Sequence, residues 1–123
     1  MRYINKRKGG GRMDFEQATE KALSFRDERE WQQFHNLKDL AVSISIEAAE
    51  LLEVFQWSGS DLAVEEKSDR AKEELADIII YCIYFADKLG VNVADIVNSK
   101  IDINNEKYPA DRACGNSRKY TEL

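Results

Sequence analysis

Apolar residues recur every three or four positions along most of the chain, which is the spacing of one face of an α-helix. The pattern predicts four helices, over residues 14–28, 37–57, 65–89 and 93–106. The third is apolar around much of its circumference, so we expect it to be buried on more than one side, including by a helix of a second subunit. The second has the most regular apolar stripe, formed by Leu37, Leu40, Ala41, Ile44, Ala48, Leu51, Leu52 and Phe55.

Residues at the ends of these segments support the same boundaries. Asn36 and Asn92 stand where N-caps are expected, because their side chains can accept hydrogen bonds from the first free N–H groups of a helix. Gly90 is a typical helix stop, and Pro109 prevents the last helix from continuing far. Residues 110–123 are predicted to form an irregular C-terminal tail. The expected fold class is therefore all-α, with four main helices and a tail.

Charge is distributed unevenly along the 123 residues, which carry 18 basic and 23 acidic side chains and a net charge of −5. Residues 1–12 contain five basic residues and no acid, and we expect them to be a flexible basic leader or an upstream segment. Residues 13–123 then form one domain with a net charge of −10. Such an acidic body disfavours nucleic acid as a partner and favours divalent cations.

The sequence contains no pattern typical of membrane insertion or secretion. No apolar run approaches the roughly 18 residues that a membrane helix needs, and no secretory signal pattern follows the basic start. Cys82 and Cys114 do not belong to a CxxC pair, so they are expected to be reduced thiols. These features predict a cytoplasmic protein without a membrane partner.

Two pairs of acidic residues lie within apolar helical segments. Glu47 and Glu50 share one face of the second helix, and Glu74 and Asp77 share one face of the third, because each pair is three residues apart. Four converging carboxylates would repel one another unless a hard cation bound between them. Mg²⁺ suits oxygen ligands when a phosphate substrate completes its coordination. The alternative is a solvated acidic face with ordinary salt bridges.

Two other kinds of metal site lack the ligands they need. A di-iron bundle requires Glu-x-x-His motifs, but His35 is the only histidine and lies outside both acidic pairs. A calcium loop beginning at Asp102 would place Lys107 where an EF-hand requires glycine. Among metal sites the acidic pairs therefore favour Mg²⁺, and a solvated acidic face stays the alternative.

Aromatic residues accompany the acidic pairs. Trp57 follows Glu50 by seven residues and falls on nearly the same helical face. An aromatic ring beside a metal–phosphate site could stack on a nucleobase, as could Trp31 with His35 nearby. Core packing is the alternative for both tryptophans, and a hydrogen-bonded loop position is the alternative for the histidine.

The fourth helical segment presents polar residues at helical spacing. Lys100, Asn104 and Tyr108 are each four residues apart and would line one face. Lysine and asparagine side chains can donate hydrogen bonds to polyphosphate oxygens. The alternative is an ordinary solvated face.

Taken together and in order, five segments resemble the MazG-like family of all-α nucleoside triphosphate pyrophosphohydrolases. The resemblance covers about residues 14–123 and extends to the dCTP pyrophosphatase branch of the family. The segments are REWQQFH (29–35), EAAELLEVFQW (47–57), EELADIIIY (73–81), KIDINNEKYP (100–109) and SRKYTEL (117–123).

The resemblance implies a fold, an assembly and an activity. Two subunits would build shared helical bundles, so that oligomerisation completes the bundle, and the dimers usually pair again as a tetramer. The implied reaction is Mg²⁺-dependent hydrolysis of a nucleoside triphosphate, dCTP or a related dNTP, to the monophosphate and pyrophosphate. The implied role is housecleaning of the nucleotide pool.

The resemblance also assigns roles to residues. The four acids Glu47, Glu50, Glu74 and Asp77 would hold Mg²⁺ and position the attacking water. The substrate would be bound by Lys100 and Asn104 at its phosphates with Tyr108 nearby, and by Trp31 and Trp57 at its base with His35 beside them.

One position departs from the dCTP branch. Its members carry a pocket histidine on the first helix, and the matching position here is Ala22, which weakens the expectation of strict cytosine preference. The main rival to the enzyme hypothesis is a non-catalytic helical oligomerisation or partner-binding module with an acidic docking face. A second rival is a nucleic-acid binder that uses residues 1–12.

Overall fold

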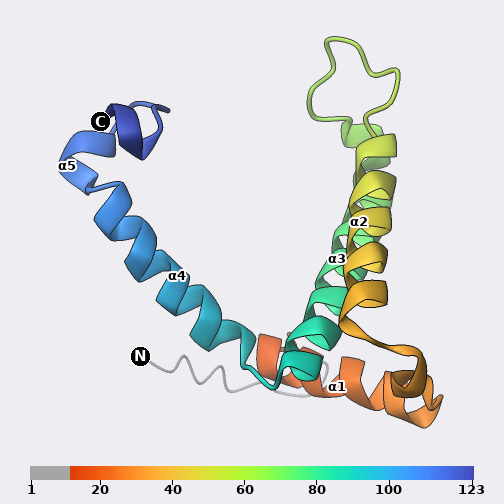
Figure 1. Ribbon diagram of the computed structural model, residues 1–123. Coiled ribbons are helices and arrows are strands. Elements are labelled where there is room, and N and C mark those ends of the chain that lie inside the picture. Colours follow the sequence, from red (N-terminus) through yellow and green to blue (C-terminus); the bar gives the residue numbers. More distant parts are fainter. Residues whose placement is uncertain (1–11) are drawn as a thin grey trace.

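The computed structural model describes residues 12–123, and every regular element in that range is helical (Figure 1). The prediction of an all-α fold with four main helices is therefore confirmed. The α-helices are α1 (Phe15–Glu28), α2 (Leu37–Glu53), α3 (Ser68–Leu89), α4 (Val93–Lys107) and the short α5 (Ala110–Ala113). Shorter 3₁₀ turns occupy Trp31–Phe34, Glu65–Lys67 and Tyr120–Glu122.

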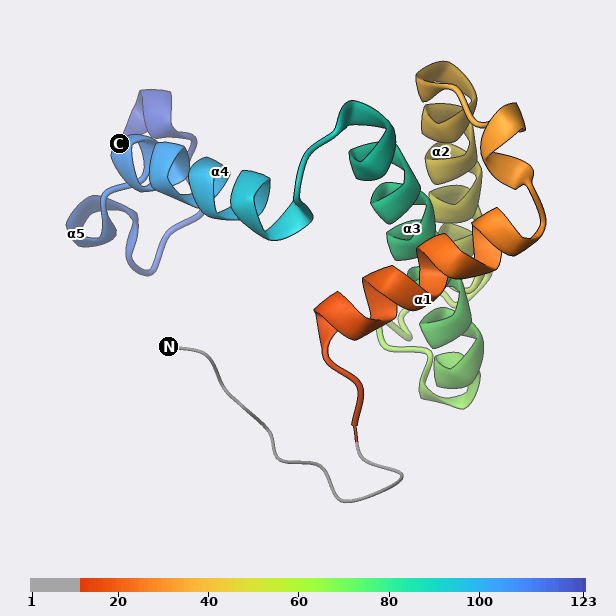
Figure 2. The ribbon, with the colours of Figure 1, turned by 90° about the horizontal axis from the view of Figure 1, so that it is seen from below.

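Two long helices form the centre of the molecule. α2 and α3 lie side by side as an antiparallel pair, joined by the loop at the upper end of Figure 1. α1 crosses this pair near its other end, which Figure 2 shows from below. α4 points away from the α2–α3 pair in both views. The acidic motifs of α2 and α3 are thus on neighbouring helices, whereas α4 stands apart.

The helix ends carry the expected caps. The side chain of Asn36 accepts a hydrogen bond from the Asp39 N–H at 2.8 Å, and Asn92 accepts one from the Asp95 N–H at 3.1 Å. Gly90 ends α3 with a φ of 70°, a left-handed conformation that glycine adopts without steric cost. α1 begins with a capping box that was not predicted, in which Asp14 and Gln17 bond reciprocally.

The predicted end of the second helix was wrong, because α2 ends at Glu53 and not at Trp57. The following residues form tight turns, with the Phe55 N–H donating to the Leu52 carbonyl at 3.0 Å. Val54 is fully buried in these turns, and Trp57 has a left-handed φ of 66°. The apolar spacing therefore extends beyond the end of the helix. The turns that follow bury Val54 as completely as a further helical turn would.

Two other boundaries differ in detail. The third predicted helix begins with the 3₁₀ turn Glu65–Lys67 before α3 starts at Ser68. The tail expected to be irregular contains α5 and a 3₁₀ turn. Pro109 explains the start of α5, since it cannot continue α4 but its fixed φ suits the residue before a new helix.

The buried core lies where α1 crosses the α2–α3 pair. Leu40, Ile83 and Tyr84 are its most buried members, and Ala22, Leu23, Ile80, Tyr81 and Phe85 pack against them. Many apolar side chains elsewhere remain accessible, among them Ile96, Val97, Ile101 and Ile103 of α4. Completion of the bundle by a second subunit therefore stays a prediction.

Three remaining expectations concern the surfaces and the beginning of the chain. No helix within residues 12–123 is both long and apolar enough to cross a membrane. Cys82 and Cys114 are free thiols. The basic leader predicted over residues 1–12 lies outside the described residues except for Arg12.

Candidate active site

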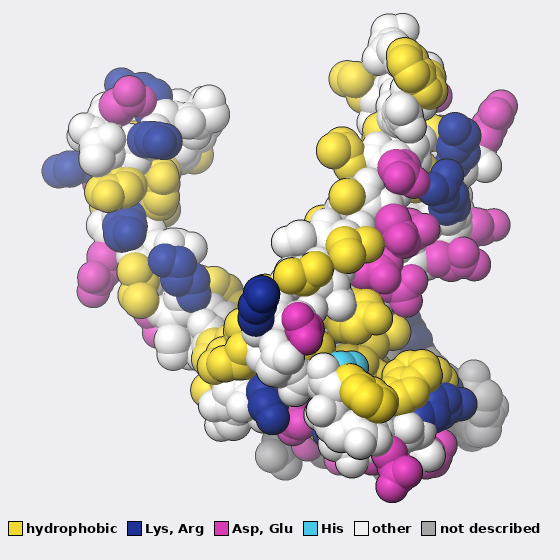
Figure 3. Space-filling model, turned by 45° about the vertical axis from the view of Figure 1, so that its right-hand side comes forward, with side chains coloured by type: hydrophobic (Ala, Val, Ile, Leu, Met, Phe, Trp, Pro, Cys, Tyr) yellow, Lys and Arg dark blue, Asp and Glu magenta, His cyan; other side chains and the backbone are white. Residues whose placement is uncertain are grey.

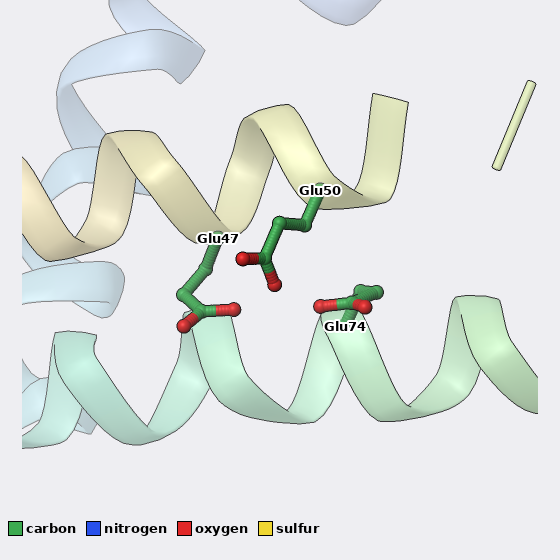
Figure 4. A group of neighbouring side chains, drawn as sticks. All are labelled: Glu47, Glu50 and Glu74. Atoms are coloured by element: carbon green, nitrogen blue, oxygen red, sulfur yellow. The ribbon is translucent and has the colours of Figure 1, made fainter. Parts of the chain in front are cut away.

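Three of the four predicted acids converge between α2 and α3. Glu47 and Glu50 point from α2 toward Glu74 on α3 (Figure 4), and each offers a carboxylate oxygen within 4.8 Å of the other two. The convergence follows from the sequence, because the i, i+3 pair on α2 faces the neighbouring antiparallel helix. The resulting carboxylate cluster consists of Glu47, Glu50 and Glu74.

The cluster contains two buried carboxylate oxygens without a hydrogen-bond partner. The Oε2 atoms of Glu47 and Glu74 are buried and accept no hydrogen bond. Burial, a shared hydrogen bond with Glu50 and repulsion from the other acids raise the pKa of Glu47 to about 7. Burial and the proximity of Glu50 also raise the pKa of Glu74. Without a cation, these carboxyl groups therefore tend to keep protons.

These features fit a hard divalent cation. All the donors are carboxylate oxygens, which are the ligands that such cations prefer. The two orphaned oxygens would gain a partner that the protein itself does not supply, and an unpaired buried charge is otherwise costly. Glu47, Glu50 and Glu74 are therefore the residues best placed to hold a metal ion.

Asp77 lies one turn after Glu74 on α3 and is not part of the tight cluster. It is close enough for its charge to help raise the pKa of Glu47. It also lines the cavity next to the cluster. The structure therefore places Asp77 at the junction between the carboxylate cluster and that cavity.

A largely apolar cavity of about 610 Å³ opens between α1, the turn Trp31–Phe34 and α3. Trp31 and His35, two of the predicted base-binding residues, both line it. Ala22, the position where the dCTP branch carries a histidine, lines it as well. The aromatic part of the wall consists of Phe15, Phe25, Trp31, His35, Tyr81 and Tyr84.

Some cavity residues were not singled out as ligand contacts from the sequence. Phe25 packs edge-on against Trp31, with ring centroids 5.6 Å apart, and Arg29 lies over the Phe25 ring at 3.7 Å. Tyr81 and Tyr84 enter the wall because they continue the helical face of Asp77 along α3. That spacing is visible in the sequence. The contribution of Phe25 to the cavity wall is not visible in the sequence, because it depends on how α1 crosses α3.

The other predicted substrate contacts do not line the cavity within one chain. Trp57 is 93% exposed in the loop that joins α2 to α3 and does not line the cavity. Lys100 and Asn104 are exposed on α4, which points away from the α2–α3 pair (Figure 1). Tyr108 follows α4 and packs edge-on against Tyr120, with ring centroids 5.9 Å apart. A single chain therefore does not bring these residues to the carboxylate cluster.

Further acidic residues surround the cluster. Figure 3 shows Asp and Glu side chains gathered on one flank of the α2–α3 pair. Arg70 lies beside the cluster, with Nη2 3.3 Å from Glu53 and Nε 3.9 Å from Glu74. This half-exposed arginine offsets only part of the local negative charge. The flank therefore remains attractive to cations.

Comparisons with known proteins agree with this arrangement. The chain is 40% identical over 104 residues to human dCTP pyrophosphatase 1 and 35% identical to the mouse protein of the same name, matching 80% of this chain in both. It spans about six tenths of the length of these relatives, since the match covers 61% of each. The crystal structure of a pyrophosphatase from Archaeoglobus fulgidus has a TM-score of 0.72 and 38% identity, covering 84% of this chain and 99% of that one.

The family comparison gives the same result. The model of the MazG-like family matches residues 42–123, a range that contains the whole carboxylate cluster and α4. The chain and its solved neighbour share much of their sequence as well as their helical fold, so the similarity is not one of fold alone. The resemblance drawn from the sequence motifs is therefore confirmed, and the chain belongs to the MazG-like family.

Proposed function

We propose that this protein is a nucleoside triphosphate pyrophosphohydrolase, which hydrolyses dCTP or a related dNTP to the monophosphate and pyrophosphate. The observation that carries the proposal is the carboxylate cluster beside an apolar, aromatic-lined cavity, with Asp77 lining the cavity and acting electrostatically on Glu47. A cavity of this kind suits a nucleobase, and the cluster suits a cation that binds phosphates. The named pyrophosphatases among its relatives support the same activity.

The cofactor that we propose is Mg²⁺, held by Glu47, Glu50, Glu74 and Asp77. When bound, it supplies positive charge to the phosphate oxygens. Glu47 or Glu50 accepts a proton from the attacking water, while the remaining acids keep the site assembled. The water oxygen forms a bond to the α- or the β-phosphorus, the anhydride bond between these two phosphates breaks, and the monophosphate and pyrophosphate are released.

The cavity determines how the rest of the nucleotide is bound. Trp31, His35 and Tyr81 surround the base, and the apolar walls exclude water from it. Asp77 lies where base and phosphates meet, so its carboxylate helps to place the triphosphate relative to the cation. Removal of unwanted nucleotides from the cellular pool is the role that fits this chemistry.

We propose that the working form is a homo-oligomer, a dimer or a dimer of dimers. Lys100 and Asn104 of one subunit would bind the phosphates at the carboxylate cluster of another, because α4 does not reach its own cluster. The exposed Trp57 would close the base cavity of a neighbouring subunit in the same way. The apolar face of α4 supports this assembly, since its side chains are about half exposed in one chain.

The decisive experiment is pyrophosphate release from each common dNTP and NTP, with Mg²⁺ and with EDTA. Release that requires Mg²⁺ is the expected result, and a maximum with dCTP would show that Ala22 is compatible with cytosine preference. A flat profile would indicate a broader pocket. If no nucleotide is hydrolysed and calorimetry detects no binding, the enzyme proposal is wrong and the acidic flank is better explained as a protein-docking face.

A further inference from the structure

Arg70 lies at the end of the carboxylate cluster that is opposite to the apolar cavity. Every α3 residue that lines the cavity follows Glu74 in the chain, from Ala76 to Tyr84. Arg70 precedes Glu74 by four residues, which is about one helical turn and about 6 Å along the axis. One face of α3 therefore presents a basic residue, then the proposed cation site and then the cavity.

Within residues 12–123, Arg70 is the one basic residue that forms an ion pair with a member of the carboxylate cluster. Nε lies 3.9 Å from Glu74, and Nη2 lies 3.3 Å from Glu53 on α2. Both contacts are long and the arginine side chain is 47% exposed, so they contribute little to stability. Nη1 takes part in neither contact. The guanidinium can therefore turn to a stronger acceptor without disrupting the fold.

A nucleotide that uses both the cavity and the cluster can lie along α3 in one direction. Its base occupies the cavity, and its phosphates reach a cation at the carboxylate cluster. The phosphates beyond the cation then continue toward Arg70, because the cavity is on the other side. There they meet Glu53, whose negative charge repels them unless a cation offsets it. Arg70 is placed to supply that positive charge.

We infer that Arg70 binds the β- and γ-phosphates of the substrate, the part that is released as pyrophosphate. The inference rests on the proposed function and adds the residue that recognises these two phosphates. A guanidinium can donate two parallel N–H groups to phosphate oxygens, and such charge-assisted bonds are stronger than neutral ones. The same positive charge offsets the negative charge of the transition state, whichever phosphorus is attacked. Arg70 therefore favours nucleoside triphosphates over monophosphates.

The first test compares two ligands that differ in these phosphates. We would titrate α,β-imido-dCTP, which resists cleavage, and dCMP into the protein with Mg²⁺ by calorimetry. We expect Arg70→Met to weaken binding of the imido compound about tenfold, the effect of one lost charge-assisted bond, and to leave the affinity for dCMP unchanged. A loss shared equally by both ligands, or no loss on the imido compound, would overturn the inference.

Lys72→Met is the matched control, because it removes the same charge from α3 two residues away. Lys72 pairs with Asp69 at 3.5 Å, outside the carboxylate cluster, and its side chain is 76% exposed. This variant should bind both ligands as the wild type does. Equal losses in Arg70→Met and Lys72→Met would show that the net charge of the helix, and not a contact with Arg70, governs binding.

The same titration separates this inference from the proposed function. A wild-type protein that neither binds nor hydrolyses any nucleotide contradicts the proposed function itself. An active wild type whose affinity for the imido compound is unchanged by Arg70→Met contradicts only the role of Arg70. If that variant also melts at a lower temperature, the arginine serves only to join α2 to α3.

A second measurement uses the products of the reaction. Pyrophosphate and dCMP are each added to the hydrolysis of dCTP at a constant concentration of free Mg²⁺. In Arg70→Met, we expect the inhibition constant of pyrophosphate to rise about tenfold and that of dCMP to stay the same. An unchanged inhibition constant for pyrophosphate would contradict the inference.

Discussion

The carboxyl group of Glu47 makes the stability of the metal-free protein depend on pH. Its pKa is raised from 4.5 to about 7, so the folded state binds this proton more tightly than the unfolded state does. This contribution to stability is fully present below pH 4.5 and is lost as the pH rises through about 7. We expect the melting temperature in EDTA to fall between about pH 5 and pH 8.

Other groups titrate in the same range, so a matched variant is needed. His35, for instance, has a lowered pKa and favours the folded state as the pH rises. Glu47→Gln removes the carboxyl group and should flatten the decline. Mg²⁺ added at about pH 8 should restore stability to the wild type but have less effect on the variant. Parallel melting curves for both proteins would show that Glu47 is not responsible.

Removing one charge from the acidic group should stop turnover without unfolding the helices. Glu50→Gln or Asp77→Asn should lower kcat by about a hundredfold or more, because each change removes an oxygen charge from the proposed cation site. Glu73→Gln is the matched control, since Glu73 is exposed on α3 beside Glu74. Circular dichroism checks the fold. Near-normal turnover of Glu50→Gln would exclude the cluster as the active site, and near-normal turnover of Asp77→Asn would exclude Asp77 from the site.

At the residue scale, the sequence predicted the acids better than the cavity. Glu47, Glu50 and Glu74 are brought together by helical spacing and by the pairing of two neighbouring helices, and both features are visible in the sequence. Phe25 lines the cavity with residues of α3 only because α1 crosses α3 at a particular place. A crossing geometry depends on the packing of many side chains, and no short motif encodes it.

At the element scale, the loop after α2 contains local backbone strain. Trp57 has a left-handed φ of 66°, a conformation that costs a non-glycine residue roughly 1–2 kcal/mol. Trp57→Gly should therefore be more stable than Trp57→Ala by about 1 kcal/mol in chemical denaturation. The alanine variant is the control because both changes remove the indole ring. Equal stability of the two variants would mean that the loop relaxes without strain in solution.

Helix boundaries were predictable where a local signal marks them. Asn36 and Asn92 act through a local hydrogen bond to a backbone N–H three residues later, so a short motif is sufficient to identify them. The end of α2 at Glu53 has no such signal, because the apolar pattern continues through buried Val54. Gly90 does mark the end of α3, since the left-handed conformation at that position favours glycine.

At the scale of the whole molecule, α4 separates two halves of the proposed active site. If Lys100 acts on the cluster of a partner subunit, then Glu50→Gln and Lys100→Ala, each inactive alone, should complement each other. An equal mixture that is unfolded and refolded together should regain about a quarter of wild-type activity, the statistical share of intact sites in a two-fold dimer. No recovery, after native mass spectrometry has shown mixed oligomers, would place Lys100 and Glu50 in the same chain's site.

The half-exposed apolar face of α4 also links catalysis to the amount of protein present. If a second copy covers Ile96, Val97 and Ile101, association contributes to the free energy of folding. Activity per chain would then fall on dilution, and the midpoint of thermal unfolding would rise with protein concentration. Total activity in a cell would then rise more than proportionally with the amount of protein made. At low concentration the chains would remain monomeric and inactive.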